Sequence, residues 1–151
     1  MIVGNRIPAG MPRILVPADE GPSLIRFAIR VAQNHRAALL ALHVQHQFRP
    51  GFAHLTVRGR EAMTFAADLV AQHIFQHLSA LCARANVPVL QIYTIHDNPG
   101  EVLLDHAATW GVEALIMGTS RRQTALPPGA GPRLEAVYRD LPDSIPMLIR
   151  A

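Results

Sequence analysis

Lysine is missing altogether from this chain of 151 residues, and all fourteen basic residues are arginine. An arginine guanidinium stays protonated in proteins and cannot act as a nucleophilic amine. The absence therefore excludes Schiff-base chemistry and the Walker-type phosphate loop, both of which need a lysine amine. The net charge of +3 is small for a chain of this length.

Cysteine is almost as scarce, because Cys82 is the only one. A single cysteine excludes an internal disulfide framework and a cysteine-rich zinc site. Cys82 falls within an apolar helical pattern, so we predict a buried packing role rather than a reactive thiol.

No apolar run approaches the roughly 18 residues needed to cross a bilayer, so no direct membrane insertion is expected. The first residues, MIVGNRIPAGMP, contain too short an apolar core for a signal peptide and resemble a loose lead-in. The sequence therefore predicts a cytoplasmic protein, or a soluble piece of a larger one.

Aromatic residues are few, and the arginines are scattered except at Arg121–Arg122. Nucleic-acid binding usually needs a basic stripe or a platform of stacking side chains. Neither is visible, so no nucleic-acid partner is predicted.

Half of the residues are hydrophobic and 17% are charged, which is typical of one folded domain with a real core. Short apolar runs alternate with helical periodicity along the whole chain. Strands are predicted at 13–17, 38–44, 87–95, 114–117 and 145–150. Helices are predicted at 23–36, at 60–85, from a cap at Asp97 or Asn98 to Gly111, and at 132–141. The apolar stripe expected on the longest helix consists of Ala66, Leu69, Val70, Ile74, Leu78 and Leu81.

Near-continuous apolar strands joined by helices indicate a parallel sheet covered on both faces. We therefore predict an α/β fold, a three-layer α/β/α sandwich with a five-stranded parallel sheet, over 13–151 after a lead-in at 1–12. Ligands of such sheets lie beyond the carboxyl ends of the strands, where strand order reverses. Asp19 follows the first strand and Gly118 ends the fourth, which nominates both for one site.

The segment Leu115–Pro132, LIMGTSRRQTALPPGAGP, has the order expected of a phosphate site. A buried strand ends in a glycine, a basic and acid-free loop follows, and a second glycine opens a helix. Free backbone N–H groups and the helix dipole converge at such a helix N-terminus, where they favour an anion.

Several motifs in this order resemble the universal stress protein family. RILVPAD is similar to the first strand of that family and its aspartate, and ALLALHV to its second strand. DNPGEVLLDHAATWGVEALIMG is similar to the stretch that leads a helix into the glycine-ended fourth strand. The resemblance implies an adenine nucleotide alpha hydrolase-like fold, a role in stress response and a homodimer paired through the last strand.

Nucleotide-binding members of that family carry glycine, two residues, glycine, nine residues, glycine and then serine or threonine. Gly118 and Gly131 match the first and third glycines, whereas Arg121 and Pro132 replace the second glycine and the hydroxyl residue. The resemblance implies that Asp19 contacts the adenine side and that the backbone of Val44 lies beside the base.

These replacements indicate a remodelled site. Arginine adds bulk and prefers φ below zero where glycine allows phosphate close to the backbone, and proline lacks an N–H and a hydroxyl. Arg121 and Arg122 add guanidinium groups near the same place. We expect a non-catalytic, ligand-binding regulatory module with no certain cofactor, in which ATP or another anionic ligand is held by Asp19, Val44, Gly118, Arg121, Arg122 and Gly131 in a non-standard way.

No catalytic or metal residues are predicted. No G-x-S-x-G motif occurs, and Ser120 has no evident base beside it. His73 and His77 lie four apart on one helix, a spacing that can chelate a metal, but surface histidines are the favoured interpretation. His43 is interpreted as packing at a strand end, and the pairing of His96 with His106 as acid–base machinery is disfavoured.

Two alternatives stay open. The chain could be a soluble regulatory domain, or partner, of a membrane transporter of the amino-acid permease type. It could also be an ATP-binding protein with slow hydrolysis, in which Asp19 or Glu20 positions a metal or a water molecule.

Overall fold

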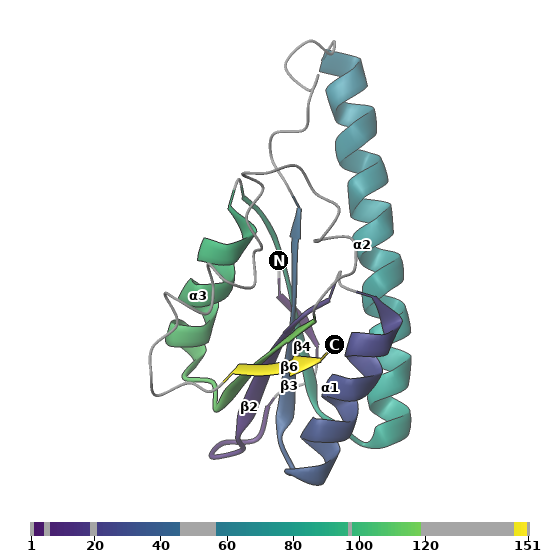
Figure 1. Cartoon of the computed structure of the whole chain (residues 1–151). Helices are drawn as coiled ribbons and strands as arrows, with labels where there is room; N and C mark the ends of the chain where they lie inside the picture. The colour runs from purple at the N-terminus through teal and green to yellow at the C-terminus, as the bar shows by residue number, and fades with distance from the viewer. Residues whose placement is uncertain are drawn as a thin grey trace.

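The computed structural model describes residues 2–4, 7–18, 21–45, 57–96, 98–118 and 147–150. Within these residues the chain forms a six-stranded sheet and three helices (Figure 1). The strands are β1 (Ile2–Gly4), β2 (Arg13–Pro17), β3 (Ala38–Gln45), β4 (Val89–Ile95), β5 (Ala114–Gly118) and β6 (Met147–Arg150). The helices are α1 (Pro22–Asn34), α2 (Val57–Ala85) and α3 (Pro99–Trp110).

The strand order across the sheet is β1-β4-β3-β2-β5-β6. Five strands, β4, β3, β2, β5 and β6 in sheet order, run parallel to one another. This confirms the predicted α/β fold and its five parallel strands. The sheet has one more strand than predicted, because β1 pairs antiparallel with β4. The lead-in was thus wrongly taken as loose at residues 2–4, whose backbone groups complete the outer edge of β4.

The order in which the chain adds strands to the sheet reverses at β2. From β2 the chain moves outward through β3 to β4, and α3 then carries it back to β5 on the other side of β2. The helices α1 and α2 lie together on one face of the sheet, and α3 lies on the other (Figure 1). Carboxyl ends of parallel strands beside such a reversal are where ligands bind in this class of fold.

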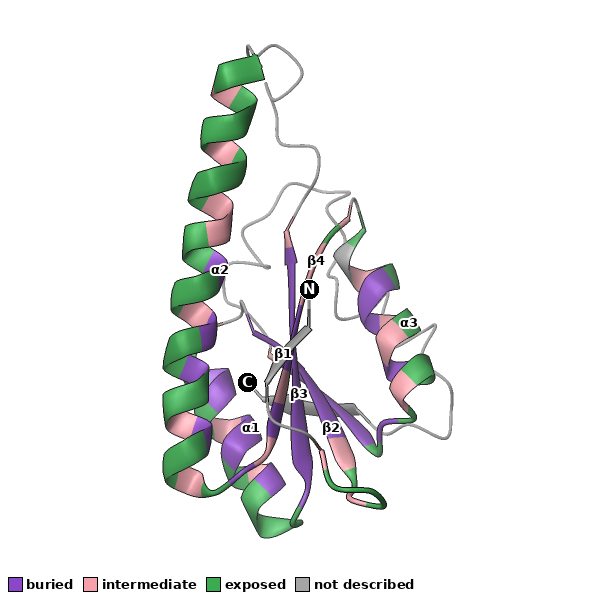
Figure 2. Ribbon diagram, turned by 180° about the vertical axis from the view of Figure 1, so that it is seen from behind, coloured by how far each residue is buried: buried purple, intermediate pink, exposed green. Residues whose placement is uncertain are grey.

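Two hydrophobic clusters fill the core, one on each face of the sheet. Successive side chains of a strand point to opposite faces, so each strand contributes to both clusters. On β3, Leu39 and Ala41 pack on the α1 and α2 side, whereas Leu40 and Leu42 pack on the α3 side. Strands that are buried on both faces explain the near-continuous apolar runs in the sequence (Figure 2).

The contact face of α2 matches the predicted stripe only in its C-terminal half, where Leu78 is buried and Ile74 and Leu81 pack against the core. Its buried residues are Ala71, Phe75, Leu78 and Cys82, whereas Leu69 and Val70 are 49% and 55% exposed. Its 29 residues span roughly 43 Å, while the eight residues of β3 span roughly 26 Å. The N-terminal half of α2 therefore extends past the sheet, and little of the described chain packs against it (Figure 2).

Local capping fixes the ends of α3. The side chain of Asn98 accepts a hydrogen bond from the backbone N–H of Glu101, so Asn98 is the cap among the two candidates. Gly111 closes the helix in the left-handed conformation at φ 57°. None of the helices in the described part of the chain is both long and apolar enough to cross a membrane.

Candidate functional site

The pairing of β2 with β3 ends before β3 itself does. The last paired residues are Pro17 and Leu42, and one further bond follows, from the Ala18 N–H to the Leu42 carbonyl at 2.8 Å. On the opposite side, β3 continues to pair with β4 as far as Gln45. The carboxyl end of β3 thus has a partner on the β4 side beyond the point where β2 has turned away.

This offset determines how the backbone of Val44 is presented. Backbone groups alternate in direction along a strand, and the carbonyl of Leu42 points toward β2. The N–H and C=O of Val44 therefore point to that same side, beyond the end of β2. The side chain of Val44 is buried in the core cluster on the α3 side, so the backbone is the part of Val44 that can meet a ligand.

A second opening lies on the other side of β2. The pairing of β2 with β5 stops at Leu15 and Leu115, although β5 continues for three residues to Gly118. Gly118 is half-buried, and it pairs outward with Arg150 of β6. The carboxyl ends of β2 and β5 therefore separate at the place where the strand order reverses, and Gly118 ends β5 there.

The remaining predicted site residues lie outside the described residues. They are Asp19, Arg121, Arg122 and Gly131, together with Pro132 and the helix predicted at 132–141. The structure places Val44 near the carboxyl end of β3 and Gly118 at that of β5, on either side of β2. The ligand-binding role of all six residues stays a prediction.

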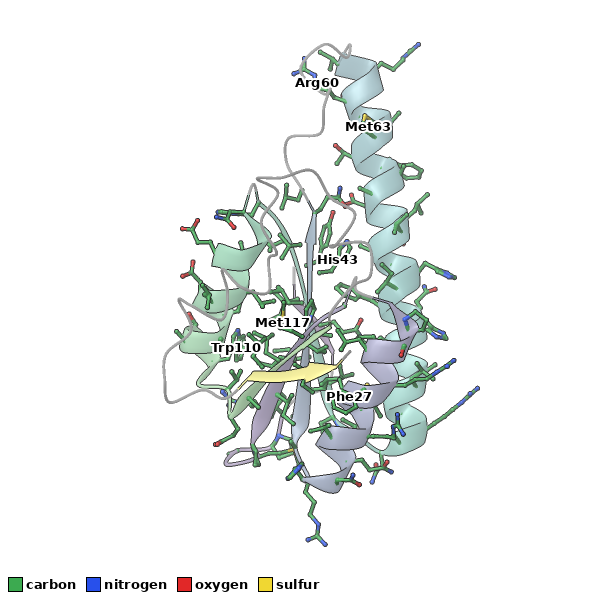
Figure 3. All side chains as sticks on the ribbon, viewed as in Figure 1. Phe27, His43, Arg60, Met63, Trp110 and Met117 are labelled. Carbon is green, nitrogen blue, oxygen red and sulfur yellow. The ribbon has the colours of Figure 1, made fainter. Side chains whose placement is uncertain are left out.

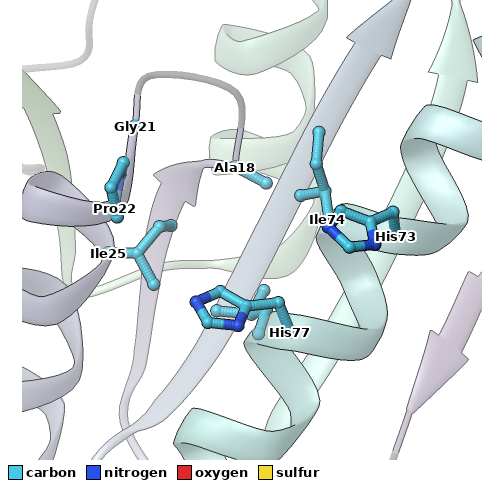
Figure 4. A pocket seen from close by; sticks show the side chains of 8 residues that line it. Ala18, Gly21, Pro22, Ile25, His73, Ile74 and His77 are labelled. Atoms are coloured by element: carbon cyan, nitrogen blue, oxygen red, sulfur yellow. The ribbon is translucent and has the colours of Figure 1, made fainter.

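A cavity of about 300 Å³ adjoins the carboxyl end of β2 (Figure 4). One wall comes from the end of β2 and the start of α1, and the other from α2. The lining residues are Ala18, Gly21, Pro22, Ile25, His73, Ile74, His77 and Leu78. This volume is at the lower end of the range of about 300–1,000 Å³ for small-molecule sites, and apart from two imidazoles the lining side chains are apolar. The sequence did not predict this cavity, because it depends on how α1 and α2 pack.

A cluster of aromatic and polar side chains joins β3 and β4 to α2. The ring of His43 stacks on Tyr93 at 5.5 Å between centroids and meets the edge of Phe75 at 6.3 Å. His43 is only 5% exposed and points from β3 to the α2 side of the sheet (Figure 3), which confirms its predicted packing role. Burial and then the neighbouring Asp68 raise the pKa of Tyr93 to about 12, so its phenol is neutral at physiological pH.

The two histidines around α3, His96 and His106, have different surroundings. His96 Nδ1 accepts a hydrogen bond from the Asn98 backbone N–H at 2.9 Å, next to the helix cap. Burial lowers the pKa of His106, and Asp105 opposes this shift. Within the described residues, no three His, Cys, Asp or Glu side chains gather closely enough to hold a metal ion.

Cys82 is fully buried within the core cluster between α2 and the sheet. Its burial raises the pKa of the thiol to about 11. Since the thiolate is the reactive form, this environment makes Cys82 inert and confirms the predicted packing role.

Comparison with known proteins agrees with this geometry. The sequence model described as the universal stress protein family matches residues 11–127 of the chain. No curated protein sequence matches it.

Several solved structures are similar in fold. The universal stress protein UspA from Lactobacillus plantarum has a TM-score of 0.70 and 17% identity, and the match covers 95% of this chain and 100% of that one. A universal stress protein in complex with cAMP has a TM-score of 0.61 and 13% identity over 93% and 98%. The protein from Archaeoglobus fulgidus in complex with dAMP has a TM-score of 0.58 and 13% identity over 91% and 96%.

Proposed function

The chain belongs to the universal stress protein family, and from this premise we propose that it is a non-catalytic, ligand-binding regulatory module with a remodelled nucleotide site. The observation that carries the proposal is the separation of the carboxyl ends of β2, β3 and β5. The backbone of Val44 and the glycine that ends β5 both lie at this separation. In our proposal the ligand lies there, with Asp19 on its base side.

The ligand class follows from the residues that replace the family signature. Arg121 and Pro132 each remove a standard phosphate contact, and such contacts contribute on the order of 1–3 kcal/mol when they are charge-assisted. Arg121 and Arg122 in turn offer guanidinium groups that bind phosphate or carboxylate oxygens in pairs. We therefore propose an anionic ligand held by arginine side chains, rather than ATP held by loop backbone.

A nucleoside monophosphate suits this proposal better than ATP. It presents one phosphate to the arginines and needs fewer of the backbone contacts that the signature glycines supply. Two proteins of similar fold are in complex with the monophosphates cAMP and dAMP. AMP, cAMP and inorganic phosphate are accordingly the first ligands to test.

Calorimetric titration of the purified chain with AMP, cAMP and ATP tests the proposal. We expect AMP or cAMP to bind at least as tightly as ATP, and we expect Asp19→Ala to weaken both monophosphates. The matched control is Glu20→Ala, which removes the neighbouring carboxylate and should leave binding unchanged. No heat and no melting shift with any of the three nucleotides, or with phosphate, would contradict a ligand-binding function.

Restoration of the signature gives a second, independent test. The double variant Arg121→Gly and Pro132→Ser recreates the spacing of glycines and hydroxyl that standard members carry. Two recovered contacts should raise the affinity for ATP by at least about tenfold, because each 1.4 kcal/mol is a factor of ten. Tight ATP binding by the wild type, with no gain in the double variant, contradicts the remodelled site.

We also propose a homodimer paired through β6. Within the described residues, β6 ends the parallel part of the sheet and pairs with β5 alone. An edge strand with unpaired backbone groups is a surface that a second copy can extend by two-fold symmetry. Sedimentation equilibrium of the wild type and of Ile149→Pro tests this, since proline is poorly tolerated within a paired strand and should shift the equilibrium toward the monomer.

The proposal places the chain in the cytoplasm and without catalytic residues. Release of ADP during prolonged incubation with ATP, lost in Asp19→Ala, would instead favour the alternative of a slow hydrolase. Coding sequence upstream that contains apolar runs of membrane-spanning length would favour the alternative of a transporter domain.

A further inference from the structure

His73 and His77 are four residues apart on α2, and both line the same cavity (Figure 4). We propose that this pair chelates a divalent transition metal ion at the wall of the cavity. The proposal does not depend on nucleotide binding, because it uses none of the residues assigned to the nucleotide ligand.

The helix supplies the geometry. Residues four apart lie one above the other on one face, with about 5–6 Å between their Cβ atoms. Two imidazoles at this spacing reach one metal ion with N–metal distances of roughly 2.0–2.1 Å, as in helical zinc sites. Both imidazoles project from α2 toward the side of α1 that carries Pro22 and Ile25 (Figure 4).

The state of the two side chains favours binding over packing. Both residues are exposed, so their rings can turn to a metal without leaving a packed core. Neither ring has a hydrogen-bond partner among the described residues, in contrast to His96, whose Nδ1 accepts a backbone N–H. Their nitrogen lone pairs are therefore available.

The surroundings select the class of metal. Among the described residues that line the cavity there is no carboxylate and no thiol, and the two imidazoles are the only side-chain metal donors. Imidazole suits Zn²⁺, Ni²⁺ and Cu²⁺, whereas Mg²⁺ and Ca²⁺ prefer oxygen ligands. Two protein ligands leave coordination positions that water fills, so the bound ion faces the cavity as an open Lewis acid.

Calorimetric titration of the untagged chain with NiCl₂ and with ZnCl₂, in the absence of nucleotide, tests the proposal. We expect one equivalent to bind, and MgCl₂ to produce no heat. Removal of a group that hydrogen-bonds to a metal ligand typically lowers metal affinity about 10–100-fold. His73→Ala and His77→Ala remove a ligand itself, so each should lower the affinity by at least that factor. The double variant should lose little more affinity than either single variant, because one remaining imidazole cannot chelate the ion.

Two matched controls make the result decisive. His35→Ala removes an exposed histidine at the end of α1 and should leave metal binding unchanged. His77→Ala combined with Ala80→His restores the number of histidines on α2 but separates them by two turns, roughly 10 Å along the axis. We expect no recovery of affinity. Equal and independent losses in the two single variants, or recovery in the relocated variant, would overturn the chelating pair in favour of separate surface histidines.

Discussion

The hydroxyl of Tyr93 on β4 donates a hydrogen bond to Asp68 Oδ1 on α2 at 3.0 Å. Asp68 stands just before Ala71, the first buried residue of α2, so this bond holds the helix where it begins to leave the sheet. The same tyrosine ring stacks on His43, which ties the end of β3 to the contact. Tyr93 thus joins three elements next to the carboxyl edge of the sheet.

Removal of this hydroxyl should destabilise the fold measurably. Tyr93→Phe keeps the ring and its stacking but leaves the carboxylate of Asp68 without its donor. A hydrogen bond to a charged group contributes about 1.5–3 kcal/mol, and the partial exposure of both residues reduces the expected loss to about 1 kcal/mol. Urea unfolding measures this difference.

A double-mutant cycle assigns the effect to the pair. Asp68→Ala and the combination with Tyr93→Phe complete the cycle, and the two single losses should not add in the double variant. Strict additivity would show that the two side chains contribute separately and that the bond itself does not stabilise the helix.

The two halves of α2 should respond differently to the same substitution. Leu78 is 2% exposed within the core, whereas Leu69 is 49% exposed on the extending half of the helix. Leu78→Ala should cost about 2–5 kcal/mol through lost burial and a residual cavity. Leu69→Ala should stay within about 0.5 kcal/mol, as surface substitutions do. Similar losses at both positions in urea unfolding would contradict the contact face described for α2.

The sequence predicted those parts of the fold that local patterns determine. Apolar runs identified every parallel strand, and the turn residues around Gly111 identified the end of α3. The sequence did not predict β1, which forms because β4 offers an edge for it to pair with. It predicted the contact face of α2 only in part, because only the C-terminal half of this helix lies over the sheet.

In the candidate site, too, local patterns could be predicted from the sequence and packing could not. Gly118 could be predicted because a glycine directly after a buried strand is a local signal, and Val44 came from a motif at the end of a strand. The shared cavity of His73 and His77 could not be predicted, since it requires the position of α1 against α2. The ligand-binding roles of Val44 and Gly118, and those of Asp19, Arg121, Arg122 and Gly131, stay predictions that ligand titrations test.

Gly111 should be hard to replace for a purely conformational reason. Its φ of 57° is left-handed, and a Cβ added there would meet no atom within 4 Å. Gly111→Ala should therefore cost about 1 kcal/mol through backbone strain and not through a clash. Gly111→Asn is the matched control, because asparagine tolerates this conformation, and it should cost less. Equal costs for the two variants in thermal unfolding would point to a steric cause instead.

Cys82 should make the stability of the fold sensitive to alkaline pH. Burial raises the pKa of this thiol from 9.0 to about 11, so folding favours the neutral form. The contribution is fully present below pH 9.0 and is lost as the pH rises through about 11. Urea unfolding across this window should therefore show a steeper loss of stability for the wild type than for Cys82→Ala, which has no thiol to titrate.

Alkylation provides the independent check on the same thiol. Iodoacetamide reacts with the thiolate, so the native chain should stay unmodified near neutral pH and become modified at one site in urea. Fast modification of the native chain would mean that Cys82 is reached without unfolding. Parallel pH curves for the wild type and Cys82→Ala would mean that its ionisation is not coupled to folding. Either result contradicts a thiol held neutral between α2 and the sheet.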